Sequence, residues 1–160
     1  KDATDADWDV VVSAYARLAA KATDYRFCFE RHGGTLTDDW PCAKRLLERL
    51  PQPNIGLNYQ FLSGETTEMV CKSLAEAKDR LLNFHVQNGK KLPDGSRQPA
   101  DAASGDLDYR AILATLKESG FDGYLETEFV RDGVGDPKSP EAKVAAARRE
   151  CAYLRQLVGG

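Results

Sequence analysis

The stretch Leu81-Leu-Asn-Phe-His-Val-Gln87 alternates apolar and polar side chains from its second residue onward, and it ends with a histidine and an amide close together. Successive side chains of a β-strand point to opposite faces of the sheet. The apolar face holds Leu82, Phe84 and Val86, and the polar face holds Asn83, His85 and Gln87. In a parallel barrel the outer face packs under helices, the inner face fills the pore, and chemistry gathers at the carboxyl ends of the strands. The stretch is typical of such a strand.

Three further runs show the same alternation, and each is followed by a helical stretch. They are Tyr25-Arg-Phe-Cys-Phe-Glu-Arg-His32, Asn54-Ile-Gly-Leu-Asn-Tyr-Gln60 and Gly123-Tyr-Leu-Glu-Thr-Glu-Phe129. The four runs, taken as parallel strands, deliver four polar side chains to corresponding positions, namely Glu30, Gln60, His85 and Glu128. Carboxylate and amide oxygens together with an imidazole nitrogen form a ligand set suited to one divalent cation. The runs therefore predict a metal site at the carboxyl edge of a parallel sheet.

Helical patterns surround the four runs. We expect helices over residues 5–21, 38–50, 66–80 and 106–119, and a last helix with Ser139 as its N-cap and Pro140 in its first turn. Helices that alternate with single strands favour right-handed βαβ units and a parallel sheet. We therefore predict an α/β fold of the (β/α)8 TIM-barrel type, of which this chain supplies about four βα units.

Four such units make half of a barrel, since a full barrel takes roughly 250 residues. No linker or low-complexity segment divides residues 1–160, so we expect them to form a single domain. The helix over residues 5–21 precedes any strand, which predicts an upstream half barrel. The alternative is that a second copy closes the barrel in a homo-oligomer, because an open sheet alone would leave its edges bare.

Residues 88–105 form the longest expected loop and are rich in turn-forming residues. Their position after the His85 strand makes them a candidate lid. Arg97 on this loop is placed to meet a phosphate or carboxylate of a substrate, although basic loop residues are usually only solvated. Trp40 follows the loop after the Glu30 strand and is either a wall of a sugar site or a packing residue.

Charge and composition argue against several classes of partner. The net charge of −3 is too small to indicate binding to nucleic acid or to an anionic membrane. The sequence has neither an apolar stretch of the roughly 18 residues that a membrane span needs nor a signal-peptide pattern at Lys1, so we expect a soluble, cytoplasmic protein. The cysteines lie far apart without a CxxC spacing, which favours free thiols over a disulfide framework or a zinc site.

Five segments carry a further signal through their order and spacing. They are Glu30-x-His32, Gly56-Leu-Asn-Tyr-Gln60, the strand with His85, Gly105-Asp-Leu-Asp-Tyr-Arg-Ala-Ile-Leu113 and Gly120-Phe-Asp-Gly-Tyr-Leu-Glu-Thr-Glu128. Together they resemble the C-terminal half of the xylose-isomerase-like TIM barrels, a superfamily that includes sugar and sugar-phosphate isomerases, ketose 3-epimerases, hydroxypyruvate isomerases and inosose dehydratases. The resemblance covers essentially the whole chain.

This resemblance implies a set of functional residues. One Mn²⁺, Mg²⁺, Co²⁺ or Zn²⁺ ion would be bound by Glu30, Gln60, His85 and Glu128. Glu30 and Glu128 would also be the acid/base groups that remove and return a proton on either side of a bound substrate. His32 would hold Glu30 or a substrate hydroxyl.

The sequence departs from the family at two positions. Gln60 stands where many members have an aspartate, and Ser63 stands where they have a histidine that contacts the substrate. A neutral amide leaves two carboxylates around the cation, so the site holds it less tightly than three would. The serine removes one substrate contact that is typical of the epimerases.

The expected function is that of a divalent-metal-dependent isomerase or epimerase of a small sugar, sugar phosphate or polyol, with dehydratase chemistry as a close variant. The metal would stabilise the enediolate formed by proton removal. The candidate substrate contacts are His32, Trp40 and Arg97. The alternative is a non-catalytic TIM-barrel protein with a sugar-binding or structural role, which the neutral Gln60 favours. An endonuclease-IV-like phosphodiesterase is disfavoured, because that chemistry uses many histidines and this chain has 2.

Overall fold

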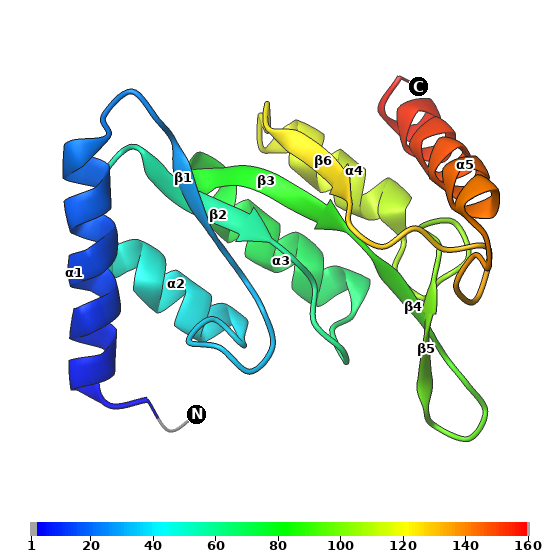
Figure 1. The fold of residues 1–160 in the computed structure, drawn as a ribbon, viewed down its shortest axis with the longest axis horizontal. Helices are drawn as coiled ribbons and strands as arrows, with labels where there is room; N and C mark the ends of the chain where they lie inside the picture. The colour runs from blue at the N-terminus through cyan, green and yellow to red at the C-terminus, as the bar shows by residue number, and fades with distance from the viewer. Residues whose placement is uncertain (1–2, 160) are drawn as a thin grey trace.

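The computed structural model describes residues 3–159, which form a parallel sheet, flanking helices and a separate β-hairpin (Figure 1). The helices are α1 (Asp5–Lys21), α2 (Trp40–Arg49), α3 (Thr67–Ala77), α4 (Tyr109–Glu118) and α5 (Pro140–Val158), with a 3-10 turn η1 over Lys78–Arg80. The strands are β1 (Phe27–Glu30), β2 (Ile55–Tyr59), β3 (Leu81–Val86), β4 (Asn88–Lys91), β5 (Arg97–Ala100) and β6 (Tyr124–Thr127). Within residues 3–159, no helix combines the length and the apolar character needed to cross a membrane.

The main sheet has the strand order β1-β2-β3-β6, and each neighbouring pair is parallel. Parallel neighbours need a crossover connection, which α2 supplies between β1 and β2 and α3 supplies between β2 and β3. The predicted parallel βα units are therefore confirmed. The strands are shorter than the runs in the sequence. As a result, Gln60 and Glu128 lie just past the last paired residues of β2 and β6.

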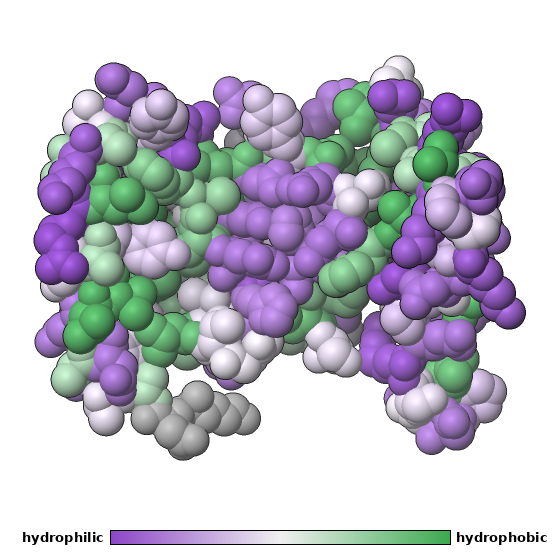
Figure 2. Space-filling view, in the orientation of Figure 1, coloured by the Kyte–Doolittle hydropathy of each residue, from purple (hydrophilic) through white to green (hydrophobic). Residues whose placement is uncertain are grey.

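One face of the sheet is apolar and covered by helices. Phe29, Leu57 and Phe84 are at most 3% exposed. The ring of Phe84 stacks on Tyr59 at 5.8 Å and meets Tyr109 of α4 edge-on at 6.3 Å. In Figure 1, α3 and α4 lie behind β3 and β6, and Figure 2 shows from the same side a hydrophilic patch at the centre of the molecule. The polar side chains of the strands therefore lie on the open face.

A β-bulge between β2 and β3 aligns these polar side chains. The pairing shifts by one residue, which brings Asn58 opposite Asn83, and Leu82 is the extra residue. A Cβ at Gly56 would lie 2.5 Å from Cγ of Leu82, so the bulge requires a glycine there. The bulge corrects one expectation, because Leu81 is the core residue and Leu82, expected on the helix-covered face, lies beside Gly56.

The segment over residues 88–105, expected to be an open loop, contains the antiparallel hairpin β4–β5. Asn88 anchors the hairpin, since its side-chain nitrogen donates to the carbonyls of Ala102 and Leu107 and its oxygen accepts the N–H of Leu107. These bonds satisfy a buried amide. The partners lie well beyond β4 in the sequence, which is why local turn composition did not reveal the hairpin.

The helix α4 begins later than predicted. Its N-cap is Asp108, whose side chain accepts the N–H of Arg110, and not Asp106. Asp106 belongs to the hairpin instead, because its carboxylate accepts the N–H of Lys91 at 2.7 Å and its own N–H donates to the carbonyl of Gly89 at 2.8 Å. The carboxylate of Asp106 is therefore engaged with the hairpin and does not cap α4.

The hairpin is also tied to the segment between β6 and α5. Ala100 and Val134 form an antiparallel bridge. The N–H of Asp101 donates to the carbonyl of Gly133, and the carboxylate of Asp101 accepts the N–H of Gly133. These contacts make the hairpin a wall beside the sheet and not the free lid that its position after the His85 strand suggested.

Glu150 of α5 fastens the same region from the other side. It is 5% exposed, and its carboxylate accepts the N–H of Ala102 at 2.9 Å. Burial raises the pKa of Glu150, and the hydrogen bond from Ala102 partly opposes this effect. A raised pKa means that the folded protein binds this proton more tightly than the unfolded chain does. The stabilising contribution is therefore present below the unfolded pKa and is lost as the pH rises through the folded pKa.

We expect Glu150→Gln to remove this dependence on pH. Relative to the unmodified chain, the variant should gain free energy of unfolding as the pH rises from about 4 to neutral, because only the unmodified chain then holds a buried charge. Urea denaturation at a series of pH values measures the difference. Two profiles that stay parallel over this range would contradict the raised pKa.

Candidate metal centre and substrate pocket

Three ionisable side chains from three strands meet on the open face of the sheet. His85 on β3 is 8% exposed. Its Nδ1 lies 3.5 Å from Oε1 of Glu30, which ends β1, and 3.4 Å from Oε2 of Glu128, which directly follows β6. Glu128 follows the strand next to that of His85, whereas Glu30 lies two strands away on β1, so the cluster gathers side chains from across the sheet.

Gln60, the fourth predicted ligand, lies in the same cluster. Its amide oxygen is 3.0 Å from Nδ1 of His85. In the opposite orientation of the amide, the nitrogen lies 2.8 Å from Oε1 of Glu30 and 2.9 Å from Oε2 of Glu128. The first orientation directs oxygens and a ring nitrogen toward one point, as a bound cation would favour, whereas in the second the amide nitrogen donates to the two carboxylates.

The donor set fits a divalent cation. The ligand atoms of Glu30, His85 and Glu128 all lie within 4.8 Å of one another. Ligand atoms about 2.1 Å from a common ion stand roughly 3 Å apart, so small side-chain adjustments would bring them into coordination. Carboxylate and amide oxygens with one imidazole suit Mg²⁺, Mn²⁺ or Zn²⁺ better than a soft metal.

The environment of Glu128 suits proton transfer. Burial raises the pKa of Glu128, and the negative charge of Glu30 raises it further, while His85 lowers it. The side chain of Gln87 donates a hydrogen bond to Oε2 of Glu128, which orients the carboxylate. A carboxylate with a raised pKa is better matched to accepting and returning a proton near neutral pH.

The other ring nitrogen of His85 has two competing neighbours. Nε2 lies 2.8 Å from the side-chain nitrogen of Asn58 and 3.4 Å from Oε2 of Glu126. Asn83 donates to the side-chain oxygens of both, at 3.1 and 2.9 Å, and holds them in line. For Nδ1 to bind a cation the ring proton must be on Nε2, and a carboxylate beside Nε2 favours that tautomer. Donation from the nearer amide nitrogen of Asn58 would instead put the ring proton on Nδ1, so Glu126 supports metal binding at Nδ1 only against this competition.

We expect Glu126→Gln to weaken Mn²⁺ binding by about 10- to 100-fold, because an amide holds the Nε2 proton less strongly than a carboxylate does. Electron paramagnetic resonance of free Mn²⁺ during a titration measures the affinity. Asn58→Asp places a carboxylate where the competing amide nitrogen stands, so the double variant should recover affinity. Unchanged binding by Glu126→Gln alone would contradict this role.

A buried ion pair behind the site was not apparent from the sequence. Arg31 is 1% exposed, and its guanidinium donates to Oε1 and Oε2 of Glu65 at 2.7 and 2.9 Å and to the hydroxyl of Tyr59 at 3.0 Å. Glu65 also accepts the N–H of Leu62 at 2.7 Å. The network holds the loop that follows Gln60. Local sequence offered no signal for it, because an arginine at a strand end is normally solvated.

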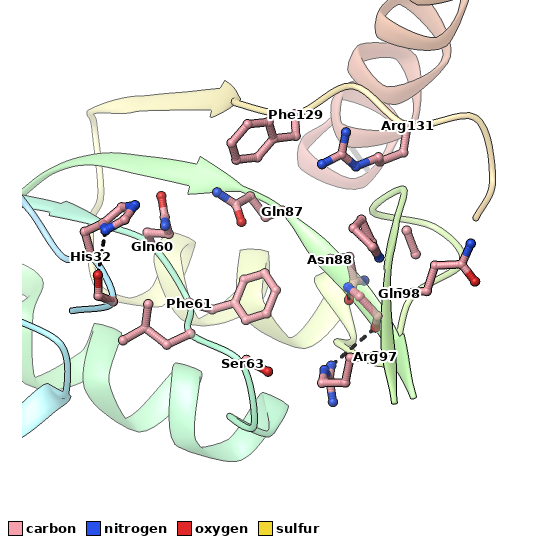
Figure 3. Close-up of a pocket in the computed structure, with 15 residues that line it drawn as sticks. His32, Gln60, Phe61, Ser63, Gln87, Asn88, Arg97, Gln98, Phe129 and Arg131 are labelled. Carbon is pink, nitrogen blue, oxygen red and sulfur yellow. Dashed lines mark hydrogen bonds between the residues drawn. The ribbon is translucent and has the colours of Figure 1, made fainter. Parts of the chain in front are cut away.

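A cavity of about 390 Å³ opens beside the cluster of Glu30, His85 and Glu128, and Figure 3 shows the residues that line it. Gln60 and Gln87, which also contact the cluster, form part of its lining. His32 and Arg97, two of the predicted substrate contacts, line it as well. Arg131, which the sequence did not single out, lines it from the segment after β6. The cavity thus joins the cluster to the hairpin.

Trp40, the third predicted substrate contact, lies elsewhere. Its ring packs against Tyr59 at 6.3 Å, and its Nε1 donates to Oε2 of Glu76 on α3 at 3.1 Å. Tyr59 belongs to the helix-covered face of the sheet, opposite the cluster of Glu30, His85 and Glu128. The structure therefore places Trp40 as a packing residue, which was the alternative reading of its position.

Comparisons with known proteins agree with this geometry. The family model described as xylose isomerase-like TIM barrel matches residues 1–157. A D-allulose 3-epimerase from Methylomonas sp. has 19% identity and a TM-score of 0.71, covering 98% of this chain and 58% of that chain. A probable 3-DHS dehydratase from Bacillus anthracis has 18% identity and a TM-score of 0.72, covering 95% and 58%. A xylose isomerase-like TIM barrel protein from Mycobacterium smegmatis, solved in complex with magnesium, has 17% identity and a TM-score of 0.72, covering 98% and 53%.

Among curated proteins, none matches the chain. The chain spans between 53% and 58% of the length of the three solved structures. At this level of identity the likeness establishes the fold, which is a partial barrel of parallel βα units.

Proposed function

The chain belongs to the xylose isomerase-like TIM-barrel family, and on that basis we propose that it supplies the metal and proton-transfer residues of a divalent-metal-dependent isomerase or epimerase of a small sugar, sugar phosphate or polyol. The observation that carries the proposal is the convergence of Glu30 and Glu128 on Nδ1 of His85. Gln60 completes the donor set. The solved structures with this fold include an epimerase and a probable dehydratase, so dehydration is a close variant of the proposal.

Glu30, Gln60, His85 and Glu128 would hold a divalent ion, which would supply positive charge to stabilise the anion formed when a substrate carbon loses a proton. Glu30 and Glu128 stand on the two outer strands of the sheet and approach the cluster from opposite sides. One carboxylate removes the proton, and the other returns it. His32 lines the cavity and would hold a substrate hydroxyl.

The proposal is tested first by titrating the purified chain with Mn²⁺. We expect one ion per chain. Loss of a residue that only bonds to a metal ligand lowers metal affinity by roughly 10- to 100-fold. We expect Glu30→Gln and His85→Ala, which each remove a ligand itself, to lower the Mn²⁺ affinity by more than this. Asp38→Asn is the matched control, because Asp38, Asp39 and Cys42 form the other group of described residues close enough to hold an ion. This control should bind Mn²⁺ like the unmodified chain.

A folded chain that fails to bind Mn²⁺, or that loses binding only in Asp38→Asn, would reject the proposed site. It would favour the non-catalytic alternative, in which the barrel binds sugar or has a structural role. Stoichiometric binding would justify a screen of sugars with the complete barrel, in which product analysis separates isomerisation, epimerisation and dehydration.

A further inference from the structure

We infer that the cavity beside the metal cluster receives the anionic end of the substrate, so that the substrate is a sugar or polyol bearing a carboxylate or a phosphate. The inference rests on the proposed function and names its substrate class. The two arginines that line the cavity, Arg97 and Arg131, would hold the anion. The polyol part would extend from there to the metal cluster at Glu30 and Glu128.

The charge of the cavity lining points to an anion. Its two charged side chains are Arg97 and Arg131, and no carboxylate is found among the described residues that line it. The chain as a whole carries a net charge of −3, so this local excess of positive charge runs against the overall composition. The remaining polar lining includes amides of Gln60, Gln87 and Gln98. Guanidinium groups recognise carboxylates and phosphates through paired hydrogen bonds.

Arg131 is held in place by its surroundings. Its side chain is 16% exposed, and its guanidinium carbon lies 5.0 Å from the centre of the Phe129 ring. Its carboxylate partner is Asp136, whose side chain is 74% exposed. An ion pair with so exposed a partner contributes little, and a guanidinium has five N–H donors. Arg131 therefore keeps donors for a ligand.

Arg97 approaches the cavity from β5 and is weakly engaged. Its Nη2 is 3.6 Å from Oδ2 of Asp106 and 3.5 Å from the carbonyl oxygen of Gly89, both longer than a strong hydrogen bond. The same oxygen of Asp106 already accepts the N–H of Lys91 at 2.7 Å. The side chain of Arg97 is 27% exposed, which leaves its guanidinium accessible to a ligand.

The two arginines are part of one connected wall. Arg97 lies on the hairpin, and Arg131 lies on the segment that the Ala100–Val134 bridge joins to that hairpin. Figure 3 shows the two side chains at the border of the cavity on different elements. A site held in this way requires little ordering when a ligand binds, which favours affinity.

The position of the cavity also gives the substrate a direction. Gln60 and Gln87 contact both the cavity and the cluster, so one small ligand can reach both. The carboxylates of Glu30 and Glu128 repel an anion, whereas the arginines attract it. The charged end of the substrate would therefore stay at the hairpin, with its hydroxyls at the cluster. A cavity of about 390 Å³ is large enough for a small sugar acid or sugar phosphate.

The test compares ligands that differ in charge, without metal. Calorimetric titration of the chain in EDTA and about 0.15 M salt, where long-range attraction is screened, uses D-fructose, D-fructose 6-phosphate and D-gluconate. We expect at least one anionic ligand to bind about 10-fold more tightly than fructose, and Arg97→Gln and Arg131→Gln each to remove about 10-fold of that affinity. Arg148→Gln, an exposed arginine on α5, is the control and should change nothing.

Preference for the phosphate or for the carboxylate identifies which anion the site takes, and either preference supports the inference. Equal binding of all three ligands, or losses in the Arg97 and Arg131 variants no larger than in Arg148→Gln, would overturn it. Mn²⁺ titration of the same samples keeps the two proposals separate. Metal binding without anion preference rejects only this inference, whereas anion preference without metal binding rejects the proposed metal chemistry.

Discussion

Replacing Arg31 by methionine is expected to lower the free energy of unfolding by about 3–5 kcal/mol, measured by urea denaturation. Methionine fills much of the same volume but leaves the Glu65 carboxylate, whose side chain is 8% exposed, without the guanidinium that neutralises it. The hydroxyl of Tyr59 loses a donor at the same time. A buried charge without a partner is among the few single changes that destabilise a domain this strongly.

Two further variants show whether the loss of stability comes from leaving the Glu65 charge buried or simply from losing an ion pair. Lys44→Met breaks the ion pair with Glu76, in which the side chain of Lys44 is 48% exposed and that of Glu76 is 31% exposed. This change should lower the free energy of unfolding by less than about 1 kcal/mol. Arg31→Met combined with Glu65→Gln removes both charges and should restore part of the lost stability. A cost for Arg31→Met no larger than that for Lys44→Met would show that Glu65 remains solvated.

Glu128→Gln in the complete protein is expected to lower kcat/KM by about 10²- to 10⁴-fold, the usual contribution of a positioned acid/base group. Glutamine keeps the size of the side chain and can still accept from Gln87, but it cannot take a proton at neutral pH. Exchange of the substrate C–H proton with deuterated solvent should fall with the turnover rate. The measurement uses whichever sugar the complete enzyme converts.

The matched control is Glu141→Gln, an exposed glutamate in the first turn of α5. It removes one negative charge far from the cluster and should leave kcat/KM unchanged. The free energy of unfolding of Glu128→Gln should stay within about 1 kcal/mol of the unmodified value, because a partly buried carboxylate with a raised pKa adds little stability. An active Glu128→Gln enzyme would remove this residue from the proposed mechanism.

Much of the fold and of the candidate site could be predicted from local patterns. Alternation in four short runs, separated by helical stretches, predicted parallel βα units, which the strand pairing confirms. The same alternation placed Glu30, Gln60, His85 and Glu128 at the carboxyl ends of the strands, and they meet in the structure. This worked because side-chain direction in a strand depends only on position, and parallel strands end at one edge.

Features that depend on contacts between distant residues were not predictable in this way. The bulge at Leu82 depends on the room left by Gly56 on the neighbouring strand. The hairpin depends on Asn88, which bonds to backbone groups at positions 102 and 107. Trp40 was open to two readings, and only its contacts with Tyr59 and Glu76 placed it on the helix side.

By itself, the sequence determined which side chains the strands present on each face and which end of the sheet collects the polar ones, because both follow from chain direction and a period of two. The tertiary structure decided how these side chains are used. The strand order brings Glu30 and Glu128 to one nitrogen of His85, and the hairpin brings Arg97 to the same cavity as Arg131. Such placements arise from packing between segments far apart in the sequence, and no local pattern encodes them.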